Sequence, residues 1–357
     1  MAADHGFARV VAGLLLTLVS IQPAAATVLG MPEVPAEVVA PTPITPVAGF
    51  GLPAAPDWTR YAYAEALIMG RDNQSFNRPL LIDDVSNATL LSTQNLQFPF
   101  GPGVRTFYGQ VGPDDRGWEV GYFGLYGQTA MATVAGDESL LLPRPLGPEM
   151  DPDGGDLATI RYSSVINSAE ANMFHHFDRW NTYRDAWLEV DWLTGFRYIG
   201  VEESANIGVV CCDGTGFPGY GVNTQNNMFG GQIGGRARLN WQRWALEGWG
   251  KAGILGNVQR QWQQPVVDFD GNVIRGATSS SGTTAGMVAD LNISAIYRLT
   301  DVWGIRAGYN TIWLGGVALA PNQFDFVAAG APGAGTLLQP NGSVFVHGAN
   351  LGLEARW

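Results

Sequence analysis

Apolar and polar residues alternate with a period of two through most of this chain. In residues 184–202 the apolar side chains stand at even positions, from Ala186 to Tyr198, whereas Asp191 and Arg197 stand at odd positions. The same alternation runs through five further segments: residues 226–241, 244–262, 284–299, 302–316 and 343–357. A period of two is typical of β-strands that have one apolar face and one polar face.

The connections between these segments predict how the strands are arranged. With four segments nearer the N-terminus, ten strands are predicted: residues 58–70, 103–111, 117–130, 159–175, 184–202, 226–241, 244–262, 284–299, 302–316 and 343–357. The links between them alternate between short and long without exception. The short links 242–243 and 300–301 are typical of tight antiparallel hairpins. The long links are residues 71–102, 131–158, 203–225, 263–283 and 317–342.

Short turns at one end and long loops at the other are the pattern of outer-membrane barrels. We therefore predict an all-β fold, an antiparallel up-and-down transmembrane β-barrel of about ten strands. The number would be twelve if residues 80–100 and 128–142 contain another hairpin. In a closed barrel the last strand pairs with the first, which explains how a strand can continue to the final residue, Trp357, without fraying.

Five aromatic residues on the apolar register lie beside a short turn or the C-terminus: Trp241, Trp244, Tyr297, Trp303 and Trp357. A ring of aromatic residues is expected where the outer face of a membrane barrel meets the lipid headgroups. The sequence therefore predicts contact with outer-membrane lipid. It also predicts recognition by the barrel-assembly machinery through the last strand, which ends at Trp357.

The polar register carries twelve charged residues: Glu189, Asp191, Arg197, Arg236, Arg238, Glu247, Lys251, Asp290, Arg298, Arg306, Glu354 and Arg356. With the apolar register facing lipid, these side chains line the lumen. A barrel of about 8 strands is just wide enough for side chains to fill, whereas open channels are found near about 16 strands. Two functions are therefore open: a porin or narrow diffusion channel for ions or small solutes, and a plugged structural or surface-recognition barrel that presents long outer loops.

A third hypothesis, a soluble β-barrel lectin or carrier, would turn the charged register outward, and the aromatic ring argues against it. Composition also favours an apolar exterior. Charged residues make up 15% of the 357 residues, below the roughly 25% of soluble domains. The formal net charge of -12 argues against binding to nucleic acid.

The N-terminus has the pattern of an export signal. Arg9 precedes an apolar run over residues 10–21, and Ala24 and Ala26 fit a cleavage site between small residues. The run is shorter than the roughly 20 residues of a membrane-spanning helix. The predicted organisation is a signal peptide at 1–26, a Pro-rich periplasmic linker at 27–57 and an outer-membrane β-barrel at 58–357.

Candidate catalytic chemistry is sparse. Of the four histidines, His5 lies in the predicted signal, His175 and His176 lie at the turn end of a strand, and His347 lies on the last strand. None is predicted beside a carboxylate or serine at the loop end, so we predict that the chain is not an enzyme. No cofactor and no metal site are predicted either.

Three other features have an ordinary explanation. The acidic segment 151–156 could bind Ca²⁺, but without a complete ligand set a solvated loop is favoured. Glycine pairs at 230–231 and 234–235 lie within a strand, which favours close packing over a phosphate-binding loop. Cys211 and Cys212 could form a strained disulfide, although two small loop residues are favoured slightly.

Several blocks of the sequence occur in the order and spacing of a known family: "SAEANM", "GFRYIGVEE", "NNMFGGQIGGRARL", "WALEGWGKAGILGN", "GIRAGYNTIWLGGVALAPNQ" and "VFVHGANLGLEARW". From residue 58 to the C-terminus the chain resembles the planctomycete β-barrel porin family numbered seven. The resemblance implies an outer-membrane β-barrel and therefore a location in the cell outer membrane. It implies little about activity, because the word porin is a structural inference for that family.

Overall fold

The computed structural model describes residues 59–357, apart from 152–153, 178–179, 184–185, 211–218 and 269. The predicted signal peptide and linker lie outside the described residues, and so do Cys211 and Cys212.

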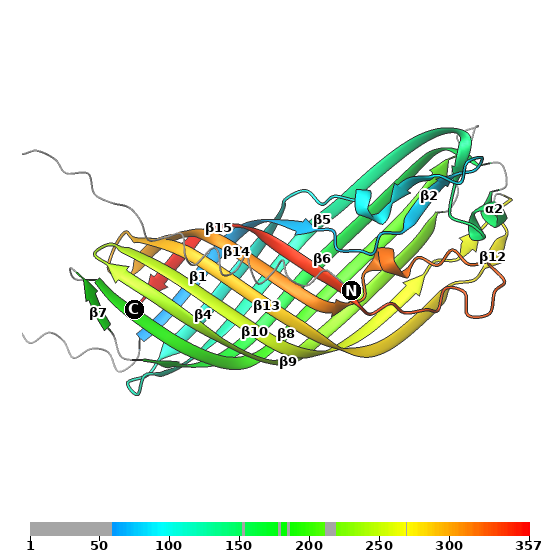
Figure 1. The fold of residues 1–357 in the computed structure, drawn as a ribbon. Helices are drawn as coiled ribbons and strands as arrows, with labels where there is room; N and C mark the ends of the chain where they lie inside the picture. The colour runs from blue at the N-terminus through cyan, green and yellow to red at the C-terminus, as the bar shows by residue number, and fades with distance from the viewer. Residues whose placement is uncertain (1–58, 152–153, 178–179, 184–185, 211–218, 269) are drawn as a thin grey trace, which may run out of the picture. The chain divides into compact units, whose positions relative to one another are not determined.

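Ten long antiparallel strands form the wall of a closed barrel in the described residues (Figure 1). They are β1 (Thr59–Asp72), β4 (Gly101–Val111), β5 (Arg116–Leu141), β6 (Gly155–His176), β8 (Ala186–Val210), β9 (Tyr220–Trp241), β10 (Trp244–Gln263), β13 (Thr278–Arg298), β14 (Trp303–Val317) and β15 (Gly342–Arg356). Around the wall the order is β5-β4-β1-β15-β14-β13-β10-β9-β8-β6, and pairing of β6 with β5 closes the ring. The last strand pairs with the first, Arg356 opposite Tyr61, so the predicted ten-stranded barrel is confirmed.

The two registers of each strand face opposite sides of the wall. On β8 the apolar residues Trp192 and Phe196 are exposed, 48% and 53%. Their neighbours Asp191, just before Trp192, and Arg197, just after Phe196, are buried. The apolar register therefore faces outward and the charged register inward. This orientation is the opposite of what the soluble-carrier hypothesis requires.

Aromatic residues mark both edges of the apolar outer band. At the turn end the structure places all five predicted aromatics on the outer face; Trp244 pairs with Trp241 on one side and with Tyr297 on the other. A second group, which the sequence analysis did not name, is exposed toward the loop end: Tyr122, Tyr126, Tyr198, Phe229 and Tyr309.

The separation of the two aromatic groups matches a membrane. From Trp241 to Phe229 the strand β9 rises over twelve residues, which is roughly 40 Å along the strand. With the usual tilt of about 40° the height becomes roughly 30 Å, the thickness of a bilayer's hydrocarbon core. The outer band therefore has the dimensions of a transmembrane surface.

The strands continue beyond the loop-side aromatic group, which corrects two predicted loops. Residues 131–158 and 203–225 are largely strand, because β5 and β8 continue to Leu141 and Val210. Here the outward residues become polar, as with Glu202 on β8. The apolar residues of β8 move to the inner face here, where Ala205, Ile207 and Val209 are buried, so a prediction based on an apolar outer face ended too early.

Small elements lie at the two ends of the barrel. At the loop end are β2 (Pro79–Asp83), β3 (Thr89–Ser92), η1 (Thr93–Asn95), α2 (Leu146–Met150), β11 (Val266–Val267), β12 (Val273–Arg275) and η2 (Ala320–Gln323), and at the turn end is β7 (Trp180–Tyr183). The hairpin β2–β3 pairs with the far end of β5 and is not part of the closed ring. The suspected extra hairpin near residues 80–100 therefore exists without making the barrel twelve-stranded. No helix in the described residues is long and apolar enough to cross a membrane.

Candidate functional site: a filled barrel interior

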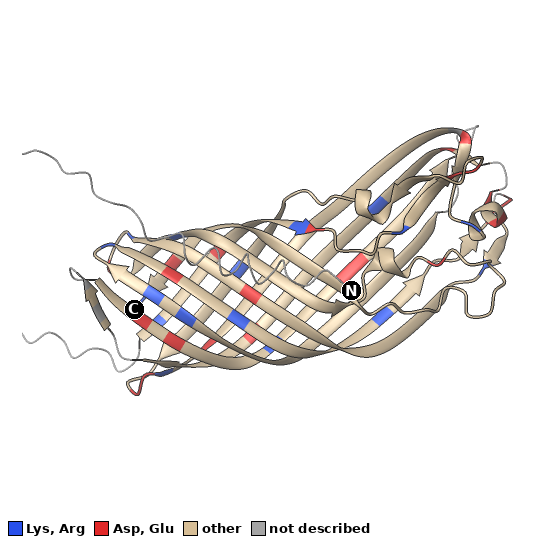
Figure 2. Cartoon of the chain, viewed as in Figure 1, with Lys and Arg blue, Asp and Glu red and all other residues tan. Residues whose placement is uncertain are grey.

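The interior of the barrel is the candidate functional site, because the polar register of its strands faces inward. In the half of the barrel at the turn end, where the C-terminus lies, acidic and basic residues alternate across neighbouring strands (Figure 2). Further toward the loop end the inner face is apolar, and beyond that the inside is occupied by parts of the outer loops. We call these three zones the charge layer, the apolar layer and the loop layer.

The charge layer contains all twelve residues that the sequence analysis assigned to the lumen. Nine are buried: Glu189, Asp191, Arg197, Arg238, Glu247, Lys251, Asp290, Arg306 and Glu354. Three are half-buried: Arg236, Arg298 and Arg356. Four more buried charges, which the sequence analysis missed, complete the layer: Glu65, Arg105, Glu119 and Glu170. These sixteen residues are eight acids and eight bases, so the formal charge of the layer is zero.

Arg306 on β14 is the centre of one cluster. Its guanidinium donates to three carboxylates, those of Glu65 at 3.0 Å, Glu247 at 2.9 Å and Glu354 at 2.6 Å. Arg238 binds two of the same carboxylates, Glu247 at 3.0 Å and Glu354 at 2.8 Å. Arginine suits this position because its planar fork of donors can serve several carboxylates at once.

Asp290 on β13 connects opposite sides of the wall. Arg197 from β8 lies 2.9 Å from its carboxylate, and Arg105 from β4 lies 3.9 Å from it. In the ring order, β13 is three strands from β8 and four strands from β4. These contacts therefore cross the lumen and leave no open passage between the strands that they join.

A third cluster surrounds two glutamates of β5 and β6. Lys251 of β10 lies 3.0 Å from Glu170 and 3.5 Å from Glu119. Arg236 of β9 reaches the same Glu119 at 3.0 Å and also Asp191 at 2.7 Å. Because β10 is four strands from β5 in the ring, this cluster crosses the lumen as well.

Aromatic side chains fill the remaining space in the charge layer. Arg306 lies with its guanidinium 4.2 Å from the ring centre of Tyr63. The ammonium of Lys251 lies 4.6 Å from the ring centres of both Phe107 and Trp249. Cations stacked on aromatic faces are stabilised by the ring quadrupole and keep water away from the ion pairs. The layer is therefore packed as well as paired.

The apolar layer lies next to the charge layer and spans the barrel. Its members come from every barrel strand except β4: Leu67, Met69, Phe123, Leu125, Ile166, Ile199, Val201, Met228, Leu255, Val288, Ile312, Leu314, Val317, Leu319, Val344 and Val346. None of them is more than 4% exposed. Side chains that lined an aqueous channel would be accessible to water, so this cross-section is filled.

The connection that follows β14 is one part of the loop layer and contributes Ala320 and Phe324 to it. Asn226 of β9 forms a pair of hydrogen bonds with the backbone of Ala318, donating to its carbonyl at 2.9 Å and accepting from its N–H at 2.8 Å. The N–H of Ala320 donates to Glu203 of β8 at 2.9 Å, and Glu203 is also paired with Arg71. Side chains of the wall thus hold this segment inside the barrel mouth.

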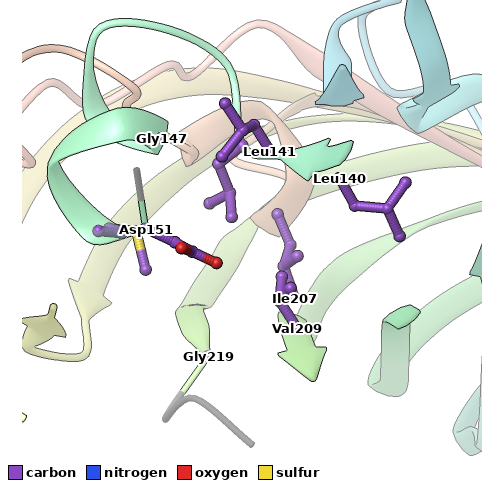
Figure 3. Close-up of a pocket in the computed structure, with 9 residues that line it drawn as sticks. Leu140, Leu141, Gly147, Asp151, Ile207, Val209 and Gly219 are labelled. Atoms are coloured by element: carbon purple, nitrogen blue, oxygen red, sulfur yellow. The ribbon is translucent and has the colours of Figure 1, made fainter. Parts of the chain in front are cut away.

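Close packing continues to the outer rim. Figure 3 shows a crevice beneath α2, lined by Leu141 of β5 and by Ile207 and Val209 of β8. Its volume is about 10 Å³, which is room for about one water molecule.

The glycine-rich part of β9 is packed closely too, since a Cβ at Gly230 or Gly234 would lie 2.4 Å from a backbone carbonyl oxygen of β10.

The histidines do not form an enclosed catalytic arrangement. His176 contacts Asp191 at the turn end. His347 lies on the outer face, where its ring is 2.6 Å from the hydroxyl of Tyr309 and 3.7 Å from the carboxylate of Asp72. This histidine–carboxylate pair at the loop side was not anticipated from the sequence. In the part of the chain that the structure describes, no group of three or more histidine, cysteine or acidic residues could hold a metal ion. The acidic segment 151–156 is described only in part.

The closed antiparallel wall, the outward apolar band and its two aromatic edges define the class of protein: a transmembrane β-barrel. Within that class, the family described as "Putative beta barrel porin-7 (BBP7)" matches residues 64–357. The chain belongs to this family. Membership implies a location in the outer membrane. No curated protein matches the chain.

The chain is similar at low identity to several solved structures. The outer membrane protease OmpT from Escherichia coli is 8% identical, with 85% of this chain and 97% of that chain covered and a TM-score of 0.47. A FadL homologue of Pseudomonas aeruginosa is 8% identical, with 85% and 90% covered and a TM-score of 0.25. A mutant of TodX, a monoaromatic hydrocarbon channel, is 10% identical, with 85% and 90% covered and a TM-score of 0.26. Likeness at this level carries no argument about function.

Proposed function

We propose that this protein is an outer-membrane β-barrel whose lumen is closed at rest, so that its function is exercised at its outer surface. The observation that carries the proposal is that two layers, the charge layer and the apolar layer, each fill the lumen and lie one after the other along the barrel. Contacts such as that between Arg197 and Asp290 cross the charge layer, and residues such as Ile312 fill the apolar layer beside it. Of the two functions left open by the sequence, the plugged structural or recognition barrel is the better supported.

Each layer opposes ion flow for a different physical reason. In the charge layer an ion would have to separate buried partners that are about 3 Å apart, and breaking such a pair costs about 3–5 kcal/mol. In the apolar layer an ion would have to give up its hydration, which is how hydrophobic constrictions close channels. Because the layers lie in series, opening one of them leaves the other closed.

The other parts of the proposal concern the chain's route and partners. Residues 1–26 act as a cleaved signal, residues 27–57 lie in the periplasm, and the long-loop end faces outward. The lipid-facing band contacts outer-membrane lipid, and the strand ending at Trp357 is read by the barrel-assembly machinery. We assign no catalytic activity, in keeping with the porin family to which the chain belongs.

The test compares ion conductance of refolded barrels in planar bilayers. One variant removes a lumen-crossing pair, Arg197→Ala with Asp290→Ala; a second thins the apolar layer, Leu67→Ala with Ile312→Ala; a third combines all four substitutions. The unaltered barrel and the two double variants are expected to be silent, whereas the combined variant conducts in discrete steps. Steps of similar size from the unaltered barrel would overturn the proposal.

A control variant tests whether conductance could arise from any loss of side-chain packing in the barrel wall. It alters the lipid-facing side of the same wall. Ile233 and Ile254 are exposed on the outer face, 67% and 72%, and the double variant Ile233→Ala with Ile254→Ala is expected to stay silent. Heat-modifiable gel mobility shows in each case that the barrel has folded. Conduction by this control as strong as that of the four-fold variant would also count against the layers as the cause of closure.

A further inference from the structure

A polar patch covers the outer wall just beyond the loop-side aromatic group. In one row across the strands, Glu202 of β8 pairs with Gln225 of β9, which pairs with Arg260 of β10. In the next row, Ser204 pairs with Asn223, which pairs with Trp262. All six side chains point outward. We call these six residues the polar ledge.

The ledge is hollowed. Five of the six ledge residues line a depression of about 300 Å³: Glu202, Ser204, Asn223, Gln225 and Trp262. Ser163 of β6, which pairs with Ser204, forms its opposite side. A concave surface of this size with polar groups converging on it is the form of small-ligand sites.

Trp262 does not belong to the aromatic edge of the membrane band. Its partner Asn223 stands six residues beyond Phe229 on β9, which is roughly 20 Å along the strand and roughly 15 Å in height. Trp262 is nevertheless 43% exposed. A large aromatic ring that is kept in water above the membrane needs a reason, since it contributes nothing to burial in lipid.

Three of the six ledge side chains are free of partners in the described part of the chain, whereas the hydroxyl of Ser204 accepts from Asn206 at 2.9 Å. Among the described residues, the side chains of Asn223, Arg260 and Trp262 form no hydrogen bond and no ion pair. Gln225 donates to Glu202 only over 3.4 Å. Arg161, on the outer face of β6, is likewise without a partner in the described residues. These groups are therefore available to a molecule that approaches from outside.

The chemistry of these groups fits a sugar. An amide group can donate to and accept from neighbouring hydroxyl groups, a carboxylate can accept from two of them, and an indole ring offers a flat apolar face to the C–H side of a pyranose ring. Arg260 and Arg161 suit phosphate, which arginine binds through two parallel hydrogen bonds. By strand spacing they lie roughly 20 Å apart, one at each side of the hollow.

We propose that the polar ledge binds the phosphorylated core sugars in the headgroup of a glycolipid in the outer leaflet. The ledge lies above the lipid-facing band on the same strands: Tyr198 and Phe229 end the band, Gly200 and Asn227 form the next outward row, and the ledge begins with Glu202 and Gln225 in the row after that. The ledge is therefore roughly 10–15 Å above the end of the band, within reach of the outer part of a large headgroup whose acyl chains lie against the band. The proposal rests on the outer-membrane placement of the barrel with its loop end outward, and it is independent of whether the lumen is closed.

The experiment measures binding of lipopolysaccharide to the full barrel, refolded in nanodiscs of phosphatidylcholine. Two probes are used, lipopolysaccharide with a complete core and lipid A without core sugars. The unaltered barrel is expected to bind the complete form at least about tenfold more tightly than lipid A. Trp262→Ala and the double variant Asn223→Ala with Gln225→Ala are each expected to weaken binding of the complete form about fivefold or more.

Matched controls come from the turn end of the barrel, where Trp180 and Gln110 are accessible on the outside. Trp180→Ala and Gln110→Ala are expected to bind as the unaltered barrel does, and gel mobility confirms folding of all variants. Equal binding of both probes, or no loss in the ledge variants, would overturn the proposal. Soluble core oligosaccharide that binds as tightly as the whole lipid would also overturn it, because the ledge would then recognise a free sugar.

Discussion

Replacement of Arg306 by alanine tests whether the charge layer is part of what holds the barrel together. Arg306 is 1% exposed and binds the carboxylates of Glu65, Glu247 and Glu354 within 3.0 Å. Its removal leaves buried negative charges whose hydration was given up on folding. Such a change destabilises a protein much more than deletion of both members of an ion pair would.

The expected loss in the free energy of unfolding depends on which partners each carboxylate retains when Arg306 is removed. Glu354 and Glu247 retain Arg238 at 2.8 and 3.0 Å. Glu65 retains the amide of Asn350 at 2.8 Å, but its nearest remaining cation is Arg105 at 3.9 Å. The uncompensated charge therefore falls mainly on Glu65. Loss of one buried partner costs about 3–5 kcal/mol, and the remaining partners place the expected loss near about 3 kcal/mol.

The assay is urea-induced unfolding of the barrel in lipid vesicles, followed by tryptophan fluorescence. Arg306→Ala is expected to lower the free energy of unfolding by about 3 kcal/mol, and addition of Glu65→Gln is expected to recover roughly half of that loss. The outward-facing change Arg260→Ala is the matched control and should have almost no effect. An Arg306→Ala barrel as stable as the unaltered one, or no recovery with Glu65→Gln, would refute the reasoning.

Three further outcomes follow from the other parts of the structure. Glu203→Gln should release residues 318–326 from the barrel mouth, seen as faster amide hydrogen exchange there, whereas Glu202→Gln on the same strand should not. Trp303→Ala should lower stability in vesicles by about 1 kcal/mol, since half-burial contributes about half of full apolar burial; an unchanged unfolding curve would contradict its place in the aromatic edge. Deletion of Trp357 should reduce assembly in the outer membrane of cells while refolding in vitro continues; normal assembly would contradict recognition of the C-terminus.

The membrane-spanning part of the fold was predictable because lipid imposes a strict pattern. Every second residue of a lipid-facing strand must be apolar, and this pattern located the six strands from residue 184 onward and the five aromatics at the turn end. Outside the membrane that requirement disappears. In the continuation of β8 the apolar positions move to the inner register, with Ala205, Ile207 and Val209 buried, so the outward alternation ended and the strand was predicted too short; Tyr198 and Phe229 were not assigned to an aromatic edge.

The interior was predictable only in part. Twelve charges were assigned on the polar register, but Arg105 was missed because the inner register around it contains no other polar residue, only Gly101, Gly103, Phe107 and Gly109. The apolar layer had a signal that could have revealed it. Ile199 and Val201 continue the register of Arg197, so the polar face becomes apolar after that arginine. Where both faces of a strand are apolar, the inside of the barrel is filled as well as the outside.

Contacts across the lumen could not be obtained from the sequence. The pairing of Asp290 with Arg197 and Arg105 depends on the diameter and stagger of the closed ring, which alternation within one strand does not encode. The same holds for the polar ledge, whose residues belong to three strands and come together only through their register. These relationships appear once the barrel is closed.

The most direct test of the closed interior is single-channel conductance of the unaltered chain without its predicted signal peptide, refolded and inserted in a planar bilayer. Heat-modifiable gel mobility must first show that the barrel is formed. The filled charge and apolar layers predict a silent membrane over the range in which the four-fold lumen variant conducts. Discrete, reproducible conductance steps from the unaltered barrel would contradict the closed lumen and favour a narrow diffusion channel.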